Sequence, residues 1–209
     1  MSAREEILSR IRGAFADAPD TPVEVPRRYA RAVDGVDVVA LFAERVGDYR
    51  ARVRVVDPAA LADVVAVELR DAGVEVLAVP ADLPGEWSAR TTARVHADSP
   101  PLSVEALDGC DGVLTGCAVA IAETGTIVLD GGPGQGRRAL TLVPDVHVCV
   151  VAAASVVGTV PEAVARLAGT RPLTWISGPS ATSDIELDRV EGVHGPRNLV
   201  VLVVDPGRR

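Results

Sequence analysis

The sequence has few aromatic residues and few of the side chains that usually bind metals. Aromatic residues make up 3% of its 209 positions, and histidine and cysteine occur three times each. Cys110, Cys117 and Cys149 form no CxxC pair and are odd in number. They therefore cannot form a complete disulfide framework or supply four ligands to an Fe–S cluster. No HExxH or similar spacing indicates a metal centre, so we expect no metal or other cofactor in this chain.

Basic charge and long apolar runs are also scarce. The formal net charge is −8 and the isoelectric point is about 4.9, which argues against binding to nucleic acid or to an anionic membrane. No apolar run approaches the ~18 residues that a membrane span requires. The charged first segment, MSAREEILSRIRG, lacks the apolar core of a signal peptide. We expect a soluble, cytoplasmic protein without a membrane span.

The apolar residues that are present favour an α/β fold. Most of the 48% hydrophobic content is Val, Ala and Leu, and small or β-branched side chains suit parallel strands covered by helices. Residues 53–56 and 74–79 are predicted strands. Between them, Asp57 and Pro58 mark the start of a helix that Gly73 ends. A strand–helix–strand unit with short links predicts a right-handed crossover and a parallel sheet.

Other periodic segments continue this alternation along the chain. Further strands are expected at residues 112–114, 119–122, 126–129, 147–151, 173–176 and 199–204. Further helices are expected at residues 36–50, 161–168 and 185–189. Residues 80–103 fit no clear pattern.

The first residues predict a separate helical arm. Ser2 and Glu5 form the pattern of a capping box. The apolar side chains that follow share one helical face, namely Ile7, Leu8, Ile11 and Phe15. Three prolines in residues 16–28 then predict an extended linker. We divide the chain into an arm with its linker, residues 1–28, and an α/β domain, residues 29–209. The arm's apolar face needs a cover, either its own domain or a neighbouring subunit such as a second copy in a homo-oligomer.

The segment AETGTIVLDGGPGQGRR, residues 122–138, begins with a candidate catalytic carboxylate. Glu123 follows a buried-looking strand, where a carboxylate would be held rigidly and partly desolvated, as suits a nucleophile or a general acid–base group. Thr124 and Thr126 add hydroxyl groups, and Gly125 would let the backbone approach a ligand closely. Alternatively, Glu-Thr-Gly is only the turn of a hairpin between two strands, and the local spacing favours that interpretation.

The same segment ends in a glycine-rich loop. The backbone N–H groups around Gly132 and Gly134, with Arg138 just beyond, could bind a phosphate or a carboxylate. The loop lacks the Lys-Ser/Thr ending of a Walker A motif, and no helical pattern follows it, so it is not a dinucleotide-binding fingerprint. A surface loop without a ligand explains these residues equally well.

A second polar segment, SGPSATSDIE at residues 177–186, follows a predicted strand. Ser180 and Thr182 precede an expected helix start, which is a natural anion site, although N-capping alone would explain them. Nearby, His194 stands in the sequence VEGVHGP. An isolated histidine is more often structural, but ligands bind at strand ends in open α/β sheets, where both segments are expected. We therefore include Ser180, Thr182 and His194 among the candidate ligand-binding residues.

Three segments together resemble the LUD-domain family, and within it the lactate-utilisation C type. They are TGCAVAIAETGTIVLDGGPGQGRRALTLVPDVHVCVV, TWISGPSATSDIELDRVEGVHGPRNLVVLVVD and the amphipathic arm. The AETGT segment, a Pro-x-x-His from Pro144 to His147, and SGPS…SDIE…GVHGP occur in the family's order. The likeness is dense over the second half of the chain and covers the first half only in general layout.

The resemblance implies a Rossmann-like fold of the NagB/RpiA/CoA-transferase-like class, with a sheet flanked by helices. It implies a non-redox subunit of a cytoplasmic complex that oxidises L-lactate to pyruvate. The partners would be lactate-utilisation subunits that contain Fe–S clusters, and this chain would bind a small anionic ligand. The cysteines that hold ferredoxin-like clusters are missing here, so the clusters are expected only in the partner subunits.

The superfamily also suggests a sharper hypothesis. In its CoA-transferases a glutamate at a strand end attacks the acyl-CoA, and Glu123 has a similar setting, which implies that Glu123 is the reactive carboxylate. The ligand-binding residues expected around it are Thr124, Gly125, Thr126, Gly132, Gly134, Arg138, Ser180, Thr182 and His194. Alternatives are a stand-alone acyl-CoA-transferase-like or sugar-phosphate enzyme that uses Glu123, and a ligand-binding regulatory module.

Overall fold

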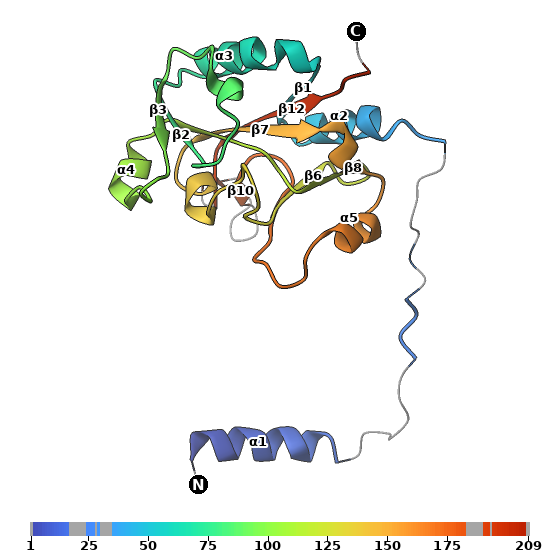
Figure 1. The fold of residues 1–209 in the computed structure, drawn as a ribbon. Helices are drawn as coiled ribbons and strands as arrows, with labels where there is room; N and C mark the ends of the chain where they lie inside the picture. The colour runs from blue at the N-terminus through green and yellow to red at the C-terminus, as the bar shows by residue number, and fades with distance from the viewer. Residues whose placement is uncertain are drawn as a thin grey trace.

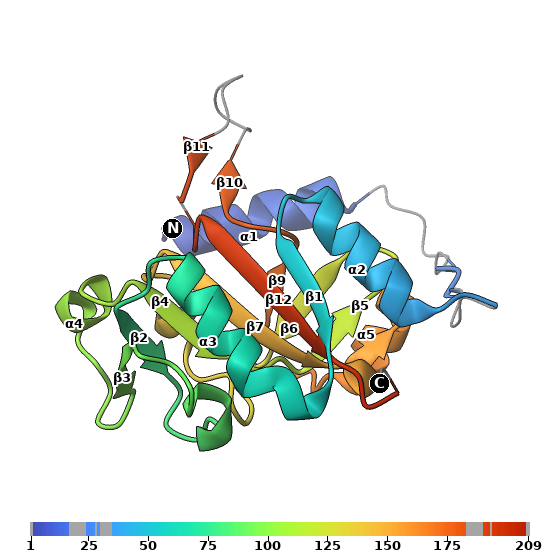
Figure 2. The ribbon, with the colours of Figure 1, turned by 90° about the horizontal axis from the view of Figure 1, so that it is seen from above.

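The fold is built on a central parallel sheet. The computed structural model describes residues 2–16, 24–27, 29, 35–182, 190–192 and 194–207. Within them, six parallel strands lie in the order β1-β12-β7-β4-β2-β3 (Figure 2). They are β1 (Arg52–Val56), β2 (Val76–Val79), β3 (Arg94–Ala97), β4 (Gly112–Thr115), β7 (Val146–Ala152) and β12 (Asn198–Val204). The predicted parallel α/β sheet is confirmed, although β1 and β2 are separated in it by three other strands.

One face of this sheet is covered by α3 (Leu61–Asp71), as Figure 1 shows. A short 3-10 turn, η1 (Pro58–Ala60), leads into α3. Asp57 caps this turn, because its carboxylate accepts a hydrogen bond of 2.8 Å from the Ala59 amide. Buried residues of α3 and alternate residues of β7 and β12 form the core on this side. The Asp-Pro pattern therefore starts the helical segment where the sequence predicts.

A polar contact ties α3 to the edge of the sheet. Glu68 of α3 is buried, with 6% of its side chain exposed. Its carboxylate lies 3.4 Å from a guanidinium nitrogen of Arg52 and 3.0 Å from one of Arg54. Both arginines belong to the edge strand β1, so this strand presents positive side chains toward the helix.

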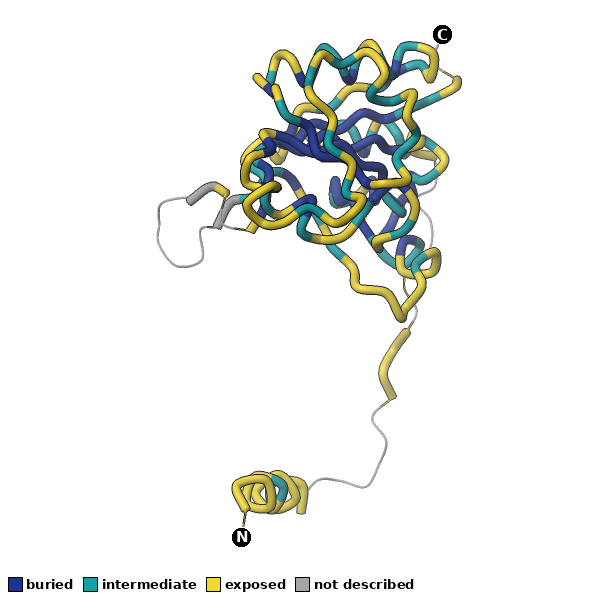
Figure 3. The backbone as a smooth tube through the Cα atoms, turned by 60° about the vertical axis from the view of Figure 1, so that its left-hand side comes forward, coloured by how far each residue is buried: buried dark blue, intermediate teal, exposed yellow. Residues whose placement is uncertain are grey.

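A second sheet packs against the other face of the central sheet. Its order is β8-β5-β6-β9, with bounds Val156–Val157, Val119–Ile121, Thr126–Leu129 and Thr174–Ile176. β5 and β6 form an antiparallel hairpin. The core between the sheets includes residues of α2 (Val38–Asp48), such as Phe42. The outer face of the second sheet is covered by α5 (Val160–Arg166). Figure 3 shows the buried strands at the centre of these layers.

The smaller elements occupy the ends of the layers. These are η2 (Gly85–Ser88), α4 (Val104–Asp108), η3 (Arg138–Thr141), η4 (Ala153–Ser155), β10 (Ala181–Thr182) and β11 (Val190–Glu191). The segment 80–103, which fitted no pattern, contains η2 and the edge strand β3. Residues of β3 are mostly exposed, so the strand lacks a clear apolar signal. The helix expected at residues 185–189 falls outside the described residues.

The arm is the helix α1 (Ala3–Ala14), and its capping box is present. The Ser2 amide donates to Glu5 at 2.7 Å, and the Glu5 amide donates to the Ser2 hydroxyl at 3.3 Å. No residue of α1 is buried, and Ile7 and Phe15 are 60% and 68% exposed. In Figure 1 the helix stands apart from the layered domain. The division of the chain at residue 28 stays a prediction.

Candidate functional site

The polar side chains of the second half meet around a cavity of about 240 Å³. It lies at the amino ends of β7 and β12, beside the loop that follows β9. Its polar or aromatic lining includes Arg138, Thr141, His147, Trp175, Ser177, Ser180 and His194. We call it the Arg138 cavity. Three of the predicted ligand-binding residues, Arg138, Ser180 and His194, are thus brought together.

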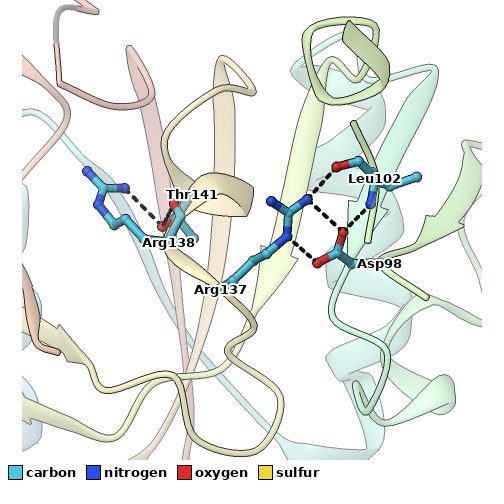
Figure 4. A network of polar contacts seen from close by, with 5 residues as sticks. All are labelled: Asp98, Leu102, Arg137, Arg138 and Thr141. Carbon is cyan, nitrogen blue, oxygen red and sulfur yellow. Dashed lines mark hydrogen bonds and ion pairs between the residues drawn. The ribbon is translucent and has the colours of Figure 1, made fainter. Parts of the chain in front are cut away.

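The two adjacent arginines behind the glycine loop point in opposite directions (Figure 4). Arg137 reaches Asp98, to which it donates two hydrogen bonds of 2.8 and 3.0 Å, and it also donates to the Leu102 carbonyl. The Leu102 amide donates to the same carboxylate at 2.7 Å. The hydrogen bonds from Arg137, aided by Leu102, lower the pKa of Asp98 against the effect of burial. Arg137 therefore serves the structure of this region.

Arg138 has no comparable partner. Its guanidinium donates to the Thr141 hydroxyl at 3.1 Å and to the His194 carbonyl at 2.9 Å. Among the residues that the structure describes, no carboxylate lies within ion-pair distance of it. Burial lowers the pKa of Arg138 below its ordinary range, but a guanidinium stays charged at neutral pH. Since only two of its five N–H donors are used within the described residues and both acceptors are neutral, the cavity is suited to an anion.

His147 is a site residue that the sequence analysis missed. It is the second residue of β7, is 1% exposed and lies in the cavity wall. A hydrogen bond of 2.8 Å joins its Nε2 to the hydroxyl of Thr115 on the neighbouring strand β4. Its only sequence signal was a histidine inside the apolar strand VHVCVV, together with the Pro-x-x-His motif. A buried imidazole held in this way can bind a ligand or exchange a proton with it.

The loop after β9 links the hairpin turn to the cavity through hydroxyl groups. The Thr126 and Ser177 hydroxyls are hydrogen-bonded at 2.8 Å, and the Thr124 and Thr126 hydroxyls at 2.7 Å. On the other side of the loop, the Ser180 hydroxyl accepts a hydrogen bond of 3.1 Å from the His194 amide. Thr124 and Thr126 therefore support the wall of the cavity without belonging to its lining.

Glu123 does not lie in the cavity lining. It is the second residue of the turn between β5 and β6, its side chain is exposed, and its amide donates to the Gly158 carbonyl at 3.1 Å. The expected partial burial of Glu123 is therefore wrong, because this residue lies on the side of the hairpin turn that faces solvent. Gly125 has a φ of +59°, and a Cβ there would lie 2.7 Å from the carbonyl carbon of Arg45. Its glycine is explained by close packing against α2.

The glycine-rich loop also lies outside the Arg138 cavity, and hydrogen bonds within the protein use several of its polar groups. The Gly132 amide and the Gln135 side chain both donate to Asp130 at 2.9 Å, and the Gly134 carbonyl accepts from Gly116 at 2.7 Å. Burial raises the pKa of Asp130, but these hydrogen bonds, with Arg171 nearby, outweigh it and lower the pKa. The amide of Gly132 is therefore not open to a ligand.

The Arg138 cavity lies at an edge of the sheet that the sequence analysis did not expect. Ligands of open α/β sheets usually bind at the carboxyl ends of the parallel strands, whereas this cavity lies at their amino ends. The carboxyl ends border a second cavity, of about 490 Å³, whose wall includes Trp87, Cys117 and Ser155. Thr182 lies in β10, and its side chain is outside the described part of the structure.

Two kinds of feature are absent from the residues that the structure describes. No group of three or more His, Cys, Asp or Glu side chains among them could hold a metal ion. None of the helices in these ranges is both long and apolar enough to cross a membrane.

Comparisons with known proteins agree with the motifs of the second half. The model of the family described as LUD domain matches residues 39–204. A lactate utilization protein C from Deinococcus radiodurans is 48% identical over 209 residues, which cover 97% of this chain and 95% of that protein. A protein of the same name from Geobacillus kaustophilus is 34% identical over 130 residues, 57% of this chain and 53% of the other. A crystal structure of a DUF162 family protein from Deinococcus radiodurans is 45% identical, with a TM-score of 0.69 over 81% of this chain and 97% of that one.

Proposed function

The chain belongs to the LUD-domain family, and on that premise we propose that it is a subunit of a cytoplasmic complex that oxidises L-lactate to pyruvate. In this proposal the subunit holds no Fe–S cluster and binds a small carboxylate of the lactate or pyruvate type in the Arg138 cavity. The name of the relatives supports the role in lactate utilisation. The observation that carries the choice of ligand is Arg138, a cation in a cavity without a described carboxylate beside it.

The chemistry of the lining fits a small acid. A guanidinium can donate two parallel hydrogen bonds to a carboxylate, which gives both affinity and orientation. The hydroxyls of Ser177 and Ser180 add donors, and His147 can hydrogen-bond to the 2-hydroxyl or 2-keto oxygen of the acid. The volume of about 240 Å³ is below the ~300–1,000 Å³ of pockets for drug-sized ligands. A short carboxylic acid therefore suits this cavity better than an intact CoA ester.

The ligand part is tested by calorimetric titration of the purified chain with L-lactate and with pyruvate. The Arg138→Gln variant should lose measurable binding of whichever acid the original chain binds. Arg70→Gln is the control, because Arg70 is exposed on α3, on the opposite face of the central sheet. Unchanged binding by Arg138→Gln, or no binding of either acid by the original chain, would overturn this part.

The complex is tested in cells that lack their own copy of the gene. A tagged chain should restore growth on L-lactate and co-purify with proteins that contain Fe–S clusters. The Arg138→Gln variant should co-purify with the same proteins but restore growth poorly, because assembly does not need the ligand contact. A chain that co-purifies with no Fe–S protein would contradict the assignment as a subunit.

A further inference from the structure

The second cavity, at the carboxyl ends of the parallel strands, contains a thiol. Its volume is about 490 Å³, and its wall includes Leu61, Trp87, Gly116, Cys117, Ala152 and Ser155. Cys117 is half-buried there. Most of the wall is apolar, apart from Glu86 and Ser155, and Cys117 is its one soft nucleophile. We call it the Cys117 cavity.

A second thiol lies directly behind Cys117. Cys149 is fully buried on β7, and the sheet register pairs it with Thr115 of β4, two residues before Cys117. Cys117 packs against the buried core cluster that contains Cys149. The Cys149 sulfur also lies 3.7 Å from the carbonyl oxygen of Gly116, the neighbour of Cys117. The thiols are therefore adjacent in space although they are far apart in the sequence.

Polar groups around Cys149 set the charge of the pair. The neighbouring Cys117, with the polar groups of His147 and Thr115, lowers the pKa of Cys149, although burial opposes this. The contact with Cys149, together with burial, raises the pKa of Cys117. Cys149 is therefore the thiol of the pair that ionises first, and its thiolate can accept the proton of Cys117. A thiolate is the form of cysteine that attacks electrophiles.

We propose that Cys117 and Cys149 are a reactive dithiol whose substrate class is small organic disulfides that enter the Cys117 cavity. The accessible thiol, Cys117, passes its proton to Cys149 and attacks one sulfur of the substrate. A mixed disulfide forms at Cys117, and the first half of the substrate leaves as a thiolate. Cys149 then attacks the sulfur of Cys117, and the second half leaves.

The products of the two steps balance. Counted from the protein with both thiols protonated, the protein loses two hydrogens, one when Cys149 ionises and one from Cys117, and gains one disulfide bond between them. The substrate disulfide is reduced to two thiols, which take up these protons. Because the two cysteines pack in one cluster and Cys149 lies beside Gly116, the second step needs only a local approach of the sulfurs. Since this chemistry is a two-electron exchange, it departs from the expectation that the subunit takes no part in redox chemistry.

Oxidation of Cys149 would also affect β7, the strand that reaches both cavities. His147, in the wall of the Arg138 cavity, lies two residues before Cys149 on the same face of β7. A disulfide would fix this strand to the segment after β4. The dithiol proposal does not depend on the proposed function, because it uses neither lactate nor a partner subunit.

The test treats the reduced, full-length chain with 2-hydroxyethyl disulfide at neutral pH and follows intact mass and peptide maps. The expected product is a protein that has lost two hydrogen atoms, with Cys117 linked to Cys149. Cys110 is the internal control, because it is buried and does not line the Cys117 cavity. Cys117 should react about tenfold faster than Cys110 or more. Linkage that appears only in denaturant, or Cys117 reacting no faster than Cys110, would overturn the proposal.

Two variants separate the two steps. Cys149→Ala should stop at the mixed disulfide on Cys117, and Cys117→Ala should leave Cys149 unmodified because it is buried. Circular dichroism verifies that each variant is folded. If a variant does not fold, the peptide map of the original chain still decides, since it reports both the linked pair and the fate of Cys110. A mixed disulfide on Cys117 that persists in the original chain would refute Cys149 as the resolving thiol, and with it the proposal.

Discussion

Arg137 and Arg138 are adjacent but have different contacts, so we expect Arg137→Gln to lose stability and Arg138→Gln to lose ligand binding. Arg137 holds a carboxylate that is 7% exposed, through two short hydrogen bonds. Breaking a fully buried ion pair costs about 3–5 kcal/mol. Arg137 itself is 39% exposed, so water can partly replace it, and we expect Arg137→Gln to cost about 2 kcal/mol. For a domain of this size that lowers the melting temperature by about 4–8 °C.

Arg138→Gln should behave in the opposite way. Its two hydrogen bonds go to neutral acceptors, and Arg138 itself is exposed, so we expect a change of melting temperature below about 2 °C. Binding of L-lactate, in contrast, loses charge-assisted hydrogen bonds worth about 1.5–3 kcal/mol. That corresponds to a dissociation constant raised by about 10- to 150-fold.

Both variants are measured by thermal unfolding followed by circular dichroism, and by calorimetric titration with L-lactate. The titrations are made at a temperature where both variants are folded. Arg137→Gln should bind lactate normally there. The reasoning is refuted if Arg138→Gln binds lactate like the original chain, or if the two variants lose stability and binding in the same proportion.

Further predictions concern the hairpin turn, the acid response and the arm. Gly125→Ala should lower the free energy of unfolding, measured in urea, by about 3 kcal/mol, because the new Cβ would meet the backbone of α2 and φ is positive. A loss below about 1 kcal/mol would contradict this. Glu123→Gln should leave lactate-dependent activity and binding unchanged, since its side chain is exposed, and a loss of turnover would restore the catalytic hypothesis. The pKa of Asp98 is lower in the folded protein than its value of 3.8 in the unfolded chain, so its carboxylate stabilises the fold at a pH above 3.8. This stabilisation is lost as the pH falls through the pKa of the folded state. The free energy of unfolding, measured in urea, should therefore fall less steeply between about pH 6 and pH 3 in Asp98→Asn than in the original chain. Equal slopes would show that Asp98 contributes nothing to this pH dependence. Removal of residues 1–28 should leave the unfolding temperature of the domain unchanged, because no residue of α1 is buried.

The sequence was informative where local physics decides the structure. The helix caps at Ser2 and Asp57 depend on neighbouring residues alone, and both are present. The strands of the central sheet could be predicted because continuous apolar runs are typical of strands buried on both faces. The second sheet could not be separated from the first, since its strands are equally buried and have the same composition. The exposed strand β3 carried no apolar signal at all.

The candidate site could be predicted only where a local sequence pattern marks its residues. Arg138, Ser180 and His194 were selected because they stand in polar segments at the ends of strands. His147 escaped selection because its neighbours in β7 are apolar, and the sequence does not reveal which face of a strand meets a cavity. Glu123 was expected to be partly buried because a strand precedes it. Which side of a turn faces solvent depends on packing with distant elements, here α2, and the local pattern does not contain that information.

The arginines of the edge strand β1 have an effect on solubility. The outer edge of β1 has no strand beside it within the described residues, and such edges readily pair with strands of other molecules. Arg52 and Arg54 place two like charges on every copy of this edge. Edge-to-edge pairing of two copies would bring these charges together, and it would also compete for the carboxylate of Glu68. The ion pair that fastens α3 to the sheet therefore also helps to keep separate molecules from aggregating along this strand.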